Sequence, residues 1–309
     1  MPAPTYRTID PAGLPPSDFY QFLISAVAPR PIAFVSTVSA AGAVNLSPYS
    51  FFNVMSSNPP ILVFSPTSRG ADNSEKDTLR NVREVPEVVI NICDYPLVEQ
   101  LSLASAEYPA GVNEFTKAGL TEAASTRVRP PRVAECPAAF ECVVEQLIAL
   151  GDGPGHGTLV VCRVVQGHFR EALLLDGRPG LDPRKFEAVS RLNGDWYSRL
   201  SPESLFPVVR PNRRLGIGFD ELPEPIRHSN VLTGNHLARL ANTERDALPT
   251  PAQVAEIKQE PMVAYLLNKH RTAPAEQAHQ LTLLGRQWLE EGKVAEAWRV
   301  LLLALAPST

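Results

Sequence analysis

The chain has 309 residues, of which 44% are hydrophobic and 20% charged, so it can form one large or two ordinary globular domains and is unlike a disordered segment. Its formal net charge of −4 gives no basic field that would attract a phosphate backbone, so we expect no nucleic-acid partner. The 30 prolines disfavour long helices and favour short elements with stiff connections, as in a β-rich fold.

Cysteine usage and hydropathy predict the compartment. The four cysteines show no CxxC pairing and three lie in apolar runs, so we expect them to be buried, reduced and structural. No basic amino-terminal segment precedes an apolar run of signal-peptide length, and the run from Val300 to Ala306 is too short to cross a bilayer. We therefore expect a cytoplasmic protein with no membrane partner.

A short helix is the first predicted element, over Asp18 to Val27. Apolar residues recur in it at helical spacing, and Pro29 stops it. We expect the helix to pack through the face formed by Phe19, Phe22, Leu23 and Val27.

Beyond Pro29 the pattern becomes that of β-strands, interrupted by two short helices. Runs of Val, Ile, Leu and aromatic residues lie between turn residues, and the last two runs are long. The polar stretch from Tyr108 to Pro137 is more typical of a functional loop than of filler. The predicted strands are Pro31–Val38, Val44–Tyr49, Ile61–Phe64, Val88–Cys93, Ala138–Leu150 and Thr158–Phe169, and the predicted helices are Asp77–Glu84, capped by Asp77, and Leu97–Ala106.

After Pro211 the pattern is helical. Two amphipathic helices, Ala275–Glu291 and Lys293–Ala306, flank Gly292 with the spacing of one tetratricopeptide unit. A single unit cannot bury its own apolar face, so we expect the pair to pack on the β domain or on a second subunit. We predict two domains, a β domain over residues 1–205 and a helical extension over residues 206–309.

Motifs for catalysis by protein side chains are absent from the sequence. The six histidines show no HExxH or other metal spacing, and there is no GxSxG elbow. The glycine-dense turn Gly151–Gly157 lacks a following Gly-Lys-Ser/Thr, so it predicts no P-loop. We therefore predict neither a metal site nor a catalytic side chain.

Small polar side chains at strand ends, next to aromatic residues, form the most informative pattern. Two blocks, Arg30–Val38 and Asn45–Asn53, place hydroxyl and amide groups where a planar ring with polar edges can bind. Farther on, Ser65–Gly70 and Lys76–Thr78 combine cationic side chains with hydroxyls at the start of a helix, where free N–H groups and the helix dipole favour a phosphate. Each block alone is also explained by a helix cap or by core packing.

In this order, the blocks resemble those of the flavin reductase-like family of FMN-binding split barrels, over roughly residues 15–200. The resemblance implies a mainly β fold, an antiparallel Greek-key split barrel with flanking short helices, which binds flavin mononucleotide (FMN) and carries here a C-terminal helical extension. The matching blocks are Ala28–Ala33, Val35–Thr37, Asn45–Pro48, Ser50–Asn53, Lys76–Asn81, Val88–Asn91, Gly111–Phe115, Ala118–Leu120, Pro130–Glu135, Glu141–Cys142 and Arg191–Tyr197.

The resemblance also implies which residues contact FMN. A structural ion pair explains Arg30 equally well, and the loop from Leu103 to Phe115 is a candidate cover over the ring. The implied contacts are Ser36, Thr37 and Val38 for the flavin, Ser50, Phe51, Phe52 and Asn53 for its pyrimidine and ribityl parts, Lys76, Asp77 and Thr78 for the phosphate, and Arg30.

With FMN bound, NADH or NADPH would deliver hydride to the flavin, and the reduced flavin would pass electrons to an unknown acceptor. We therefore predict an NAD(P)H-dependent flavin oxidoreductase with small-molecule substrates. Two alternatives stay open: an FMN-binding electron carrier or regulatory flavoprotein that reacts poorly with NAD(P)H, and an interaction protein whose helical tail binds a partner. The resemblance further implies a homodimer with the flavin near the subunit interface.

Overall fold

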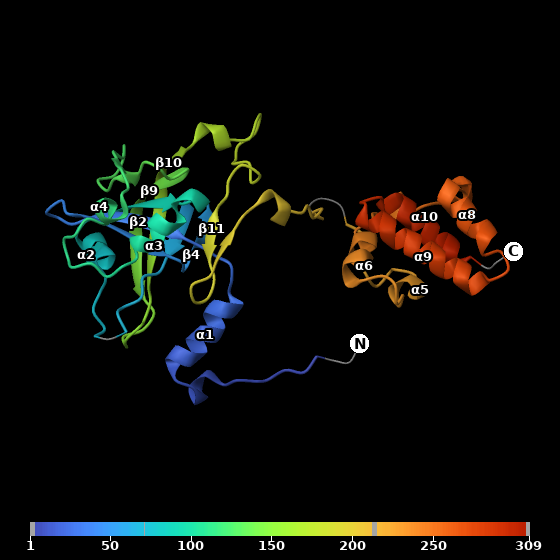
Figure 1. Cartoon of the computed structure of the whole chain (residues 1–309), viewed down its shortest axis with the longest axis horizontal. Coiled ribbons are helices and arrows are strands. Elements are labelled where there is room, and N and C mark those ends of the chain that lie inside the picture. Colours follow the sequence, from blue (N-terminus) through green and yellow to red (C-terminus); the bar gives the residue numbers. More distant parts are fainter. Residues whose placement is uncertain (1–3, 71, 212–214, 307–309) are drawn as a thin grey trace. The chain divides into compact units, whose positions relative to one another are not determined.

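The computed structural model describes residues 4–70, 72–211 and 215–306 (Figure 1). The chain divides into two compact units, residues 1–206 and residues 207–309, which we call unit 1 and unit 2. Unit 1 contains the β-strands and unit 2 is helical.

Unit 1 is built on a seven-stranded antiparallel sheet with the strand order β3-β2-β6-β9-β10-β5-β4. Its longest ladder joins β9 (Ala138–Ala149) to β10 (Thr158–Phe169). Two register shifts interrupt this ladder, and irregularities of this kind bend and twist a strand. The shorter strands are β2 (Ala33–Val38), β3 (Val44–Tyr49), β4 (Phe52–Ser57), β5 (Pro60–Phe64) and β6 (Glu87–Ile92).

The sheet has two edges, β3 and β4, and within the described residues no strand pairing joins them. The predicted antiparallel β domain followed by helices is therefore confirmed, whereas a closed barrel is not observed. Two small sheets accompany the large one: β1 (Arg30–Pro31), β11 (Val189–Arg191) and β12 (Tyr197–Arg199) form one, and β7 (Glu122–Ala123) and β8 (Arg132–Val133) form the other.

Strand β2 is buried at every position because both faces of the sheet are covered there. Successive side chains of a strand point to opposite faces, so Phe34 and Val35 enter different apolar clusters. The cluster around Phe34 includes residues of α3 (Val98–Leu103) and α4 (Glu114–Ala118), and the cluster around Val35 includes residues of α2 (Asp77–Glu84). This packing fixes where the three helices lie relative to the sheet.

Helix α1 (Pro16–Ala26) forms where a helix was predicted, but its apolar face does not pack in unit 1. Phe22, Leu23 and Val27 are 51%, 50% and 63% exposed, and Ile24 is the buried residue of the helix. The prediction of a packing helix is therefore wrong for unit 1 alone. Figure 1 shows α1 standing away from the sheet.

Two further predictions need correction. Asp77 is the first residue of α2 and not its cap, because the N-cap position is Lys76, which makes no side-chain cap hydrogen bond. Strand β4 was not predicted, since its apolar residues Val54 and Met55 are exposed on a sheet edge and do not alternate with polar ones. The remaining single helical turns are 3-10 helices at Pro11–Gly13, Tyr95–Leu97, Glu171–Leu173, Pro202–Ser204, Arg245–Ala247 and Ile257–Gln259.

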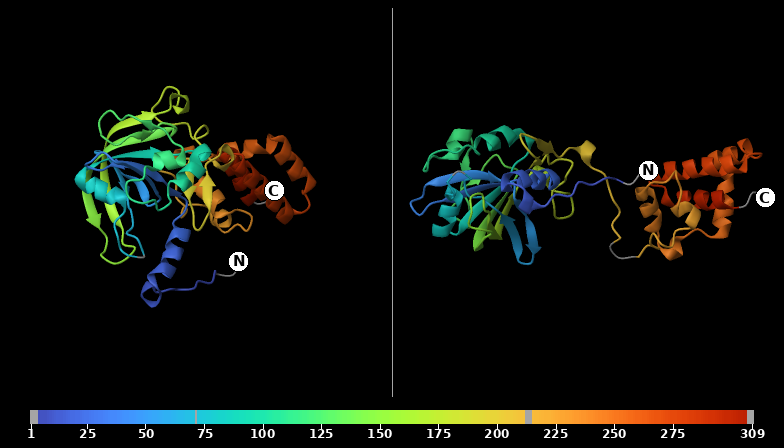
Figure 2. Two further views of the ribbon diagram at one scale, coloured as in Figure 1. Left: turned by 60° about the vertical axis from the view of Figure 1, so that its left-hand side comes forward. Right: turned by 90° about the horizontal axis from the view of Figure 1, so that it is seen from below.

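Unit 2 has its own hydrophobic core. Helices α9 (Pro274–Glu290) and α10 (Val294–Leu305) lie side by side (Figures 1 and 2). A Cβ atom at Gly285 of α9 would lie only 2.8 Å from the side chain of Leu301. Leu240 and Val263 belong to the same buried cluster, so the last two helices pack within unit 2 and do not need the β domain to form a core. The helices are α5 (Glu224–Arg227), α6 (Gly234–Ala241), α7 (Pro251–Glu256), α8 (Pro261–Lys269), α9 (Pro274–Glu290) and α10 (Val294–Leu305).

In the described part of the chain, every helix is too short or too polar to cross a membrane.

Candidate functional site

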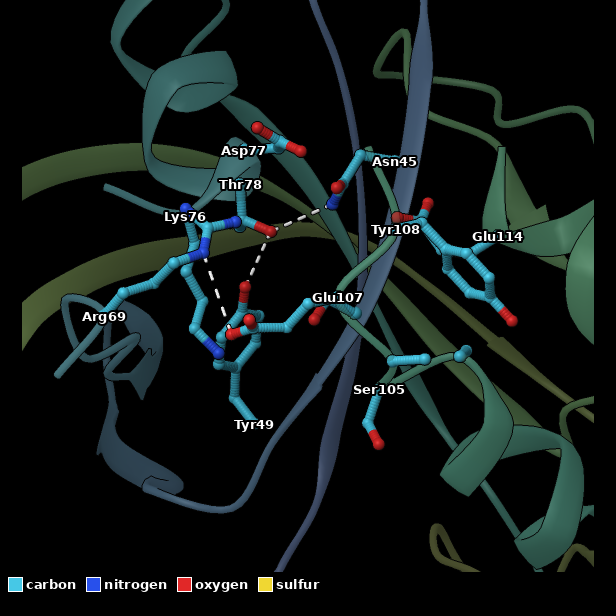
Figure 3. A pocket seen from close by; sticks show the side chains of 13 residues that line it. Asn45, Tyr49, Arg69, Lys76, Asp77, Thr78, Ser105, Glu107, Tyr108 and Glu114 are labelled. Atoms are coloured by element: carbon cyan, nitrogen blue, oxygen red, sulfur yellow. Dashed lines mark hydrogen bonds and ion pairs between the residues drawn. The ribbon is translucent and has the colours of Figure 1, made fainter. Parts of the chain in front are cut away.

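A polar pocket in unit 1 lies between β3, the start of α2 and the segment 104–108 that follows α3 (Figure 3). We call it the polar pocket. It is lined by Asn45, Ser47, Tyr49, Arg69, Lys76, Asp77, Thr78, Ala104, Ser105, Ala106, Glu107, Tyr108 and Glu114.

The hydroxyl of Thr78 connects the first turn of α2 to β3. Its Oγ1 accepts one hydrogen bond from Asn45 Nδ2 at 3.0 Å and another from the Tyr49 hydroxyl at 2.8 Å (Figure 3). Burial raises the pKa of Tyr49, which keeps the phenol protonated as a donor. One turn later, Asn81 Nδ2 donates to Thr37 Oγ1 of β2 at 3.0 Å. These buried contacts hold the start of α2 against the β2–β3 hairpin.

Two cationic side chains, Arg69 and Lys76, line the polar pocket next to Thr78 (Figure 3). Burial lowers the pKa of the Lys76 ammonium group, with a further lowering from Arg69, and the attraction of Glu107 opposes both. The guanidinium of Arg69 donates to the carbonyl of Glu75 at 2.9 Å and lies 3.7 Å from Glu107 Oε1. Because the Glu107 side chain is 71% exposed, this ion pair is weak, about 0–1 kcal/mol, and another anion can replace it.

The amino terminus of α2 also opens on the polar pocket. Lys76 at the N-cap provides no side-chain acceptor for the first N–H groups of the helix. Asp77, the first helical residue, forms an ion pair with Arg80. Such a helix start presents N–H groups and the positive end of the helix dipole to a ligand.

Glu114 is a buried carboxyl group in the wall of the polar pocket. Its Oε2 accepts a hydrogen bond from the backbone N–H of Leu46 at 2.9 Å, which links α4 to β3. Burial raises the pKa of Glu114 above its usual value of 4.5.

The structure brings together part of the site that the sequence predicted. Lys76, Asp77 and Thr78 line the polar pocket, as do Ala104 to Tyr108 and Glu114 from the predicted covering loop. Residues Ser36, Thr37 and Val38 are buried in β2 and are not part of its described lining. Ser36 Oγ donates to the carbonyl of Pro131 at 2.5 Å, and Thr37 accepts from Asn81.

The other predicted contacts lie outside the lining of the polar pocket. Phe51 contacts Tyr20 edge to face with 6.3 Å between ring centroids, Phe52 packs against the core from β4, and Asn53 is exposed. Ser50 is half-buried and lies 3.5 Å from the Nε of Arg30.

Arg30 is buried and contacts backbone carbonyl groups of unit 1. It donates to the carbonyl oxygens of Ile24 and Val27 at the end of α1 at 2.5 and 2.8 Å, and to that of Leu192 at 2.8 Å. Burial lowers its pKa. These contacts tie α1 to the turn between β11 and β12.

The predicted ring-binding block Asn45–Asn53 includes most of β3, but sequence reasoning assigned no residue of β3 to the polar pocket. Asn45, Ser47 and Tyr49 all line it, because alternate residues of a strand share one face. The polar alternation Asn-x-Ser-x-Tyr was the signal that could have identified them. Arg69 was predicted with Lys76 as part of the cationic blocks at the start of a helix, but it was not named among the FMN contacts.

Comparison with known proteins finds matches to unit 1. The family model described as "Flavin reductase like domain" matches residues 25–182. The chain belongs to the flavin reductase-like family. The resemblance noted from the sequence blocks is therefore confirmed, and the family match lies wholly within unit 1.

Solved structures of this family share the fold of unit 1. Nitrilotriacetate monooxygenase component B from Bacillus cereus is 32% identical with a TM-score of 0.62, and the match covers 67% of this chain and 100% of that chain. The 2-nitrobenzoate 2-nitroreductase NbaA from Pseudomonas fluorescens is 28% identical with a TM-score of 0.59, covering 66% and 96%. A protein from Shewanella frigidimarina, assigned as a flavin reductase with a split barrel domain, is 20% identical with a TM-score of 0.54, covering 64% and 96%, and shows the fold alone.

In the residues that the structure describes, no group of three or more His, Cys, Asp or Glu side chains could hold a metal ion.

The buried carboxyl of Glu114 predicts a specific pH dependence of stability. Because its pKa is raised in the folded state, its contribution to stability is full below pH 4.5 and is lost as the pH rises through the folded-state value. We expect the unfolding free energy of the wild type to fall relative to that of Glu114→Gln over this range, as measured by chemical denaturation at a series of pH values. Glu99→Gln on the exposed side of α3 is the matched control and should follow the wild type; identical profiles for wild type and Glu114→Gln would contradict the assignment.

Proposed function

We propose that the chain is an FMN-binding oxidoreductase of flavin-reductase type, which takes hydride from NADH or NADPH. The observation that carries the proposal is the donor set of the polar pocket, in a chain of the flavin reductase-like family. Two cations, a hydroxyl and the uncapped start of α2 converge there. Positive charge combined with N–H and O–H donors is the chemistry that binds a phosphate group.

In this proposal Arg69, Lys76 and Thr78 hold the FMN phosphate. Thr78 Oγ1 already accepts two hydrogen bonds, so its own O–H is left to donate to a phosphate oxygen. The Glu107 carboxylate would repel a bound phosphate. Because its side chain is exposed, it turns to solvent when the phosphate takes its place beside Arg69. A phosphate also offsets the desolvation of Lys76.

For the flavin ring we keep the contacts implied by the resemblance. Tyr49 lines the polar pocket and Ser50 follows it directly, so the phosphate half and the segment Ser50–Asn53 adjoin along the chain. When bound, FMN supplies the redox chemistry of the site. The residues of this chain bind the phosphate and orient the ring, and the segment 104–108 excludes water.

Charge removal at the phosphate contacts should weaken binding of FMN but not of riboflavin, which lacks the phosphate. We expect Lys76→Gln and Arg69→Gln each to lower FMN affinity about 10- to 100-fold, since a charge-assisted hydrogen bond contributes about 1.5–3 kcal/mol. Quenching of flavin fluorescence during titration measures both affinities. Arg83→Gln, at the far end of α2 and paired with Glu75, is the matched control. An equal loss for FMN and riboflavin would show that these cations do not contact the phosphate.

Hydride transfer is tested on the protein reconstituted with FMN. Under anaerobic conditions, NADH or NADPH should bleach the flavin absorbance at least tenfold faster than it bleaches free FMN, because the protein holds both reactants in one geometry. Comparison of the two nicotinamides identifies the donor. If the protein binds FMN stoichiometrically but its flavin is reduced no faster than free FMN, the reductase proposal is refuted. The alternative of an FMN-binding electron carrier would then be favoured.

We also propose a homodimer in which a second copy of the chain covers α1. The exposed Phe22, Leu23 and Val27 form an apolar surface on a helix that Arg30 anchors at its carboxyl end. We expect the wild type to sediment as a dimer, and Leu23→Asp to raise the dimer dissociation constant at least tenfold. Ser17→Asp, an exposed position on the same helix, is the control. A wild type that sediments as a monomer would contradict the proposal.

A further inference from the structure

Two of the four cysteines face each other outside the polar pocket. The Sγ atoms of Cys93 and Cys136 lie 3.4 Å apart, and both thiols are free. A disulfide has an S–S separation of about 2.05 Å, so only a small movement separates this contact from a bond. The expectation of four buried, structural cysteines is wrong for Cys136, which is half-buried, whereas Cys142 and Cys162 are buried in the sheet.

Arg170 holds the two segments that carry these cysteines. Its guanidinium donates to the carbonyl of Glu135 at 2.7 Å and lies 3.6 Å from Asp94 Oδ2, and its backbone N–H donates to the carbonyl of Pro137 at 2.9 Å. Glu135 and Pro137 flank Cys136, and Asp94 follows Cys93. Arg170 therefore contacts both segments, in addition to the β6–β9 pairing that joins them.

Cys136 is also accessible from a second pocket, which is lined by Arg132, Ala134, Cys136, Pro137, Ala139, His168, Phe169 and Arg170. His168 is fixed in its wall, because its Nε2 lies 2.6 Å from Oε1 of the buried Glu141. Arg132 and Arg170 line this pocket together with Cys136. Cys93 is buried in the apolar cluster with Leu97 and Leu101, against which Cys136 also packs, and burial raises the pKa of Cys93 well above the usual value.

We propose that Cys93 and Cys136 form a redox-active thiol pair, which a hydroperoxide entering the second pocket oxidises to a reversible disulfide. The Cys136 thiolate attacks the O–O bond, becomes a sulfenic acid and releases an alcohol, or water when the oxidant is hydrogen peroxide. The Cys93 thiol then attacks the sulfenic sulfur, so an S–S bond forms and water leaves with the sulfenic oxygen. Two electrons pass from the two sulfurs to the peroxide, and a dithiol reductant returns both thiols. This inference does not depend on the proposed flavin chemistry.

Thiol counting on the full-length protein tests the pair. The reduced protein, with and without FMN, is treated with hydrogen peroxide, blocked with an alkylating agent and denatured. We expect two of the four thiols to disappear, the intact mass to fall by two hydrogens, a peptide map to link Cys93 to Cys136, and dithiothreitol to reverse the change. The result should be the same without FMN, so failure of the flavin proposal and failure of this one are distinguishable.

Four variants assign the roles. Cys136→Ser should lower the rate of thiol loss at least tenfold, and Cys93→Ser should accumulate a sulfenic acid on Cys136 that dimedone traps. Arg170→Met, which releases the two segments, should slow disulfide formation without preventing the sulfenic acid. Cys142→Ala is the matched control and should lose two thiols as the wild type does. Resistance of the folded wild type to peroxide, a link through Cys142 or Cys162, or a crosslink between chains on a non-reducing gel would each overturn the proposal.

Discussion

The position of α2 depends on the hydroxyl of Thr78, which accepts hydrogen bonds from Asn45 and Tyr49 of the neighbouring strand. All three groups are buried, and a buried donor that loses its acceptor costs about 1–3 kcal/mol. The helix has one buried stripe, formed by Thr78, Leu79, Asn81 and Val82. Apolar packing and these polar contacts therefore specify the same orientation of α2. The start of α2 therefore lies over the polar face of β3, and the polar pocket forms where the two meet.

The two cations of the polar pocket, Arg69 and Lys76, are only weakly paired with its carboxyl groups. Lys76 is half-buried, and the pKa of its ammonium is lowered because burial outweighs the attraction of Glu107. The acidic partner of Arg69 is an exposed side chain at 3.7 Å, which contributes little to stability. A site of this kind has free energy to gain from an anion that reaches both cations. No side chain caps α2, so no cap occupies the first N–H groups of this helix.

Local sequence patterns predicted the regular elements well and the contacts between them poorly. The runs Val44–Tyr49 and Thr158–Phe169 form strands with those limits, since β-branched residues and flanking turns act locally. Edge strand β4, which does not alternate, and the helices of residues 224–269, which have at most nine residues each, were missed. In the site, Lys76 to Thr78 were found because a helix start is a local signal. Arg69 belongs to a predicted cationic block, and residues 104–108 belong to the loop that was a candidate cover over the ring. That these residues meet in one pocket depends on the tertiary fold, and the exposure of α1 is not visible in its periodicity.

The segment that borders the polar pocket is anchored at both ends and exposed between them. Ala104 is buried in the apolar cluster of α3 and α4, and Glu114 and Phe115 return the chain to that cluster. Ser105, Ala106 and Glu107 between these anchors are exposed, so few buried contacts oppose their displacement. Cys93 belongs to the same cluster as Ala104. One apolar cluster therefore buries the sulfur of Cys93 and also anchors the segment 104–108 beside the polar pocket.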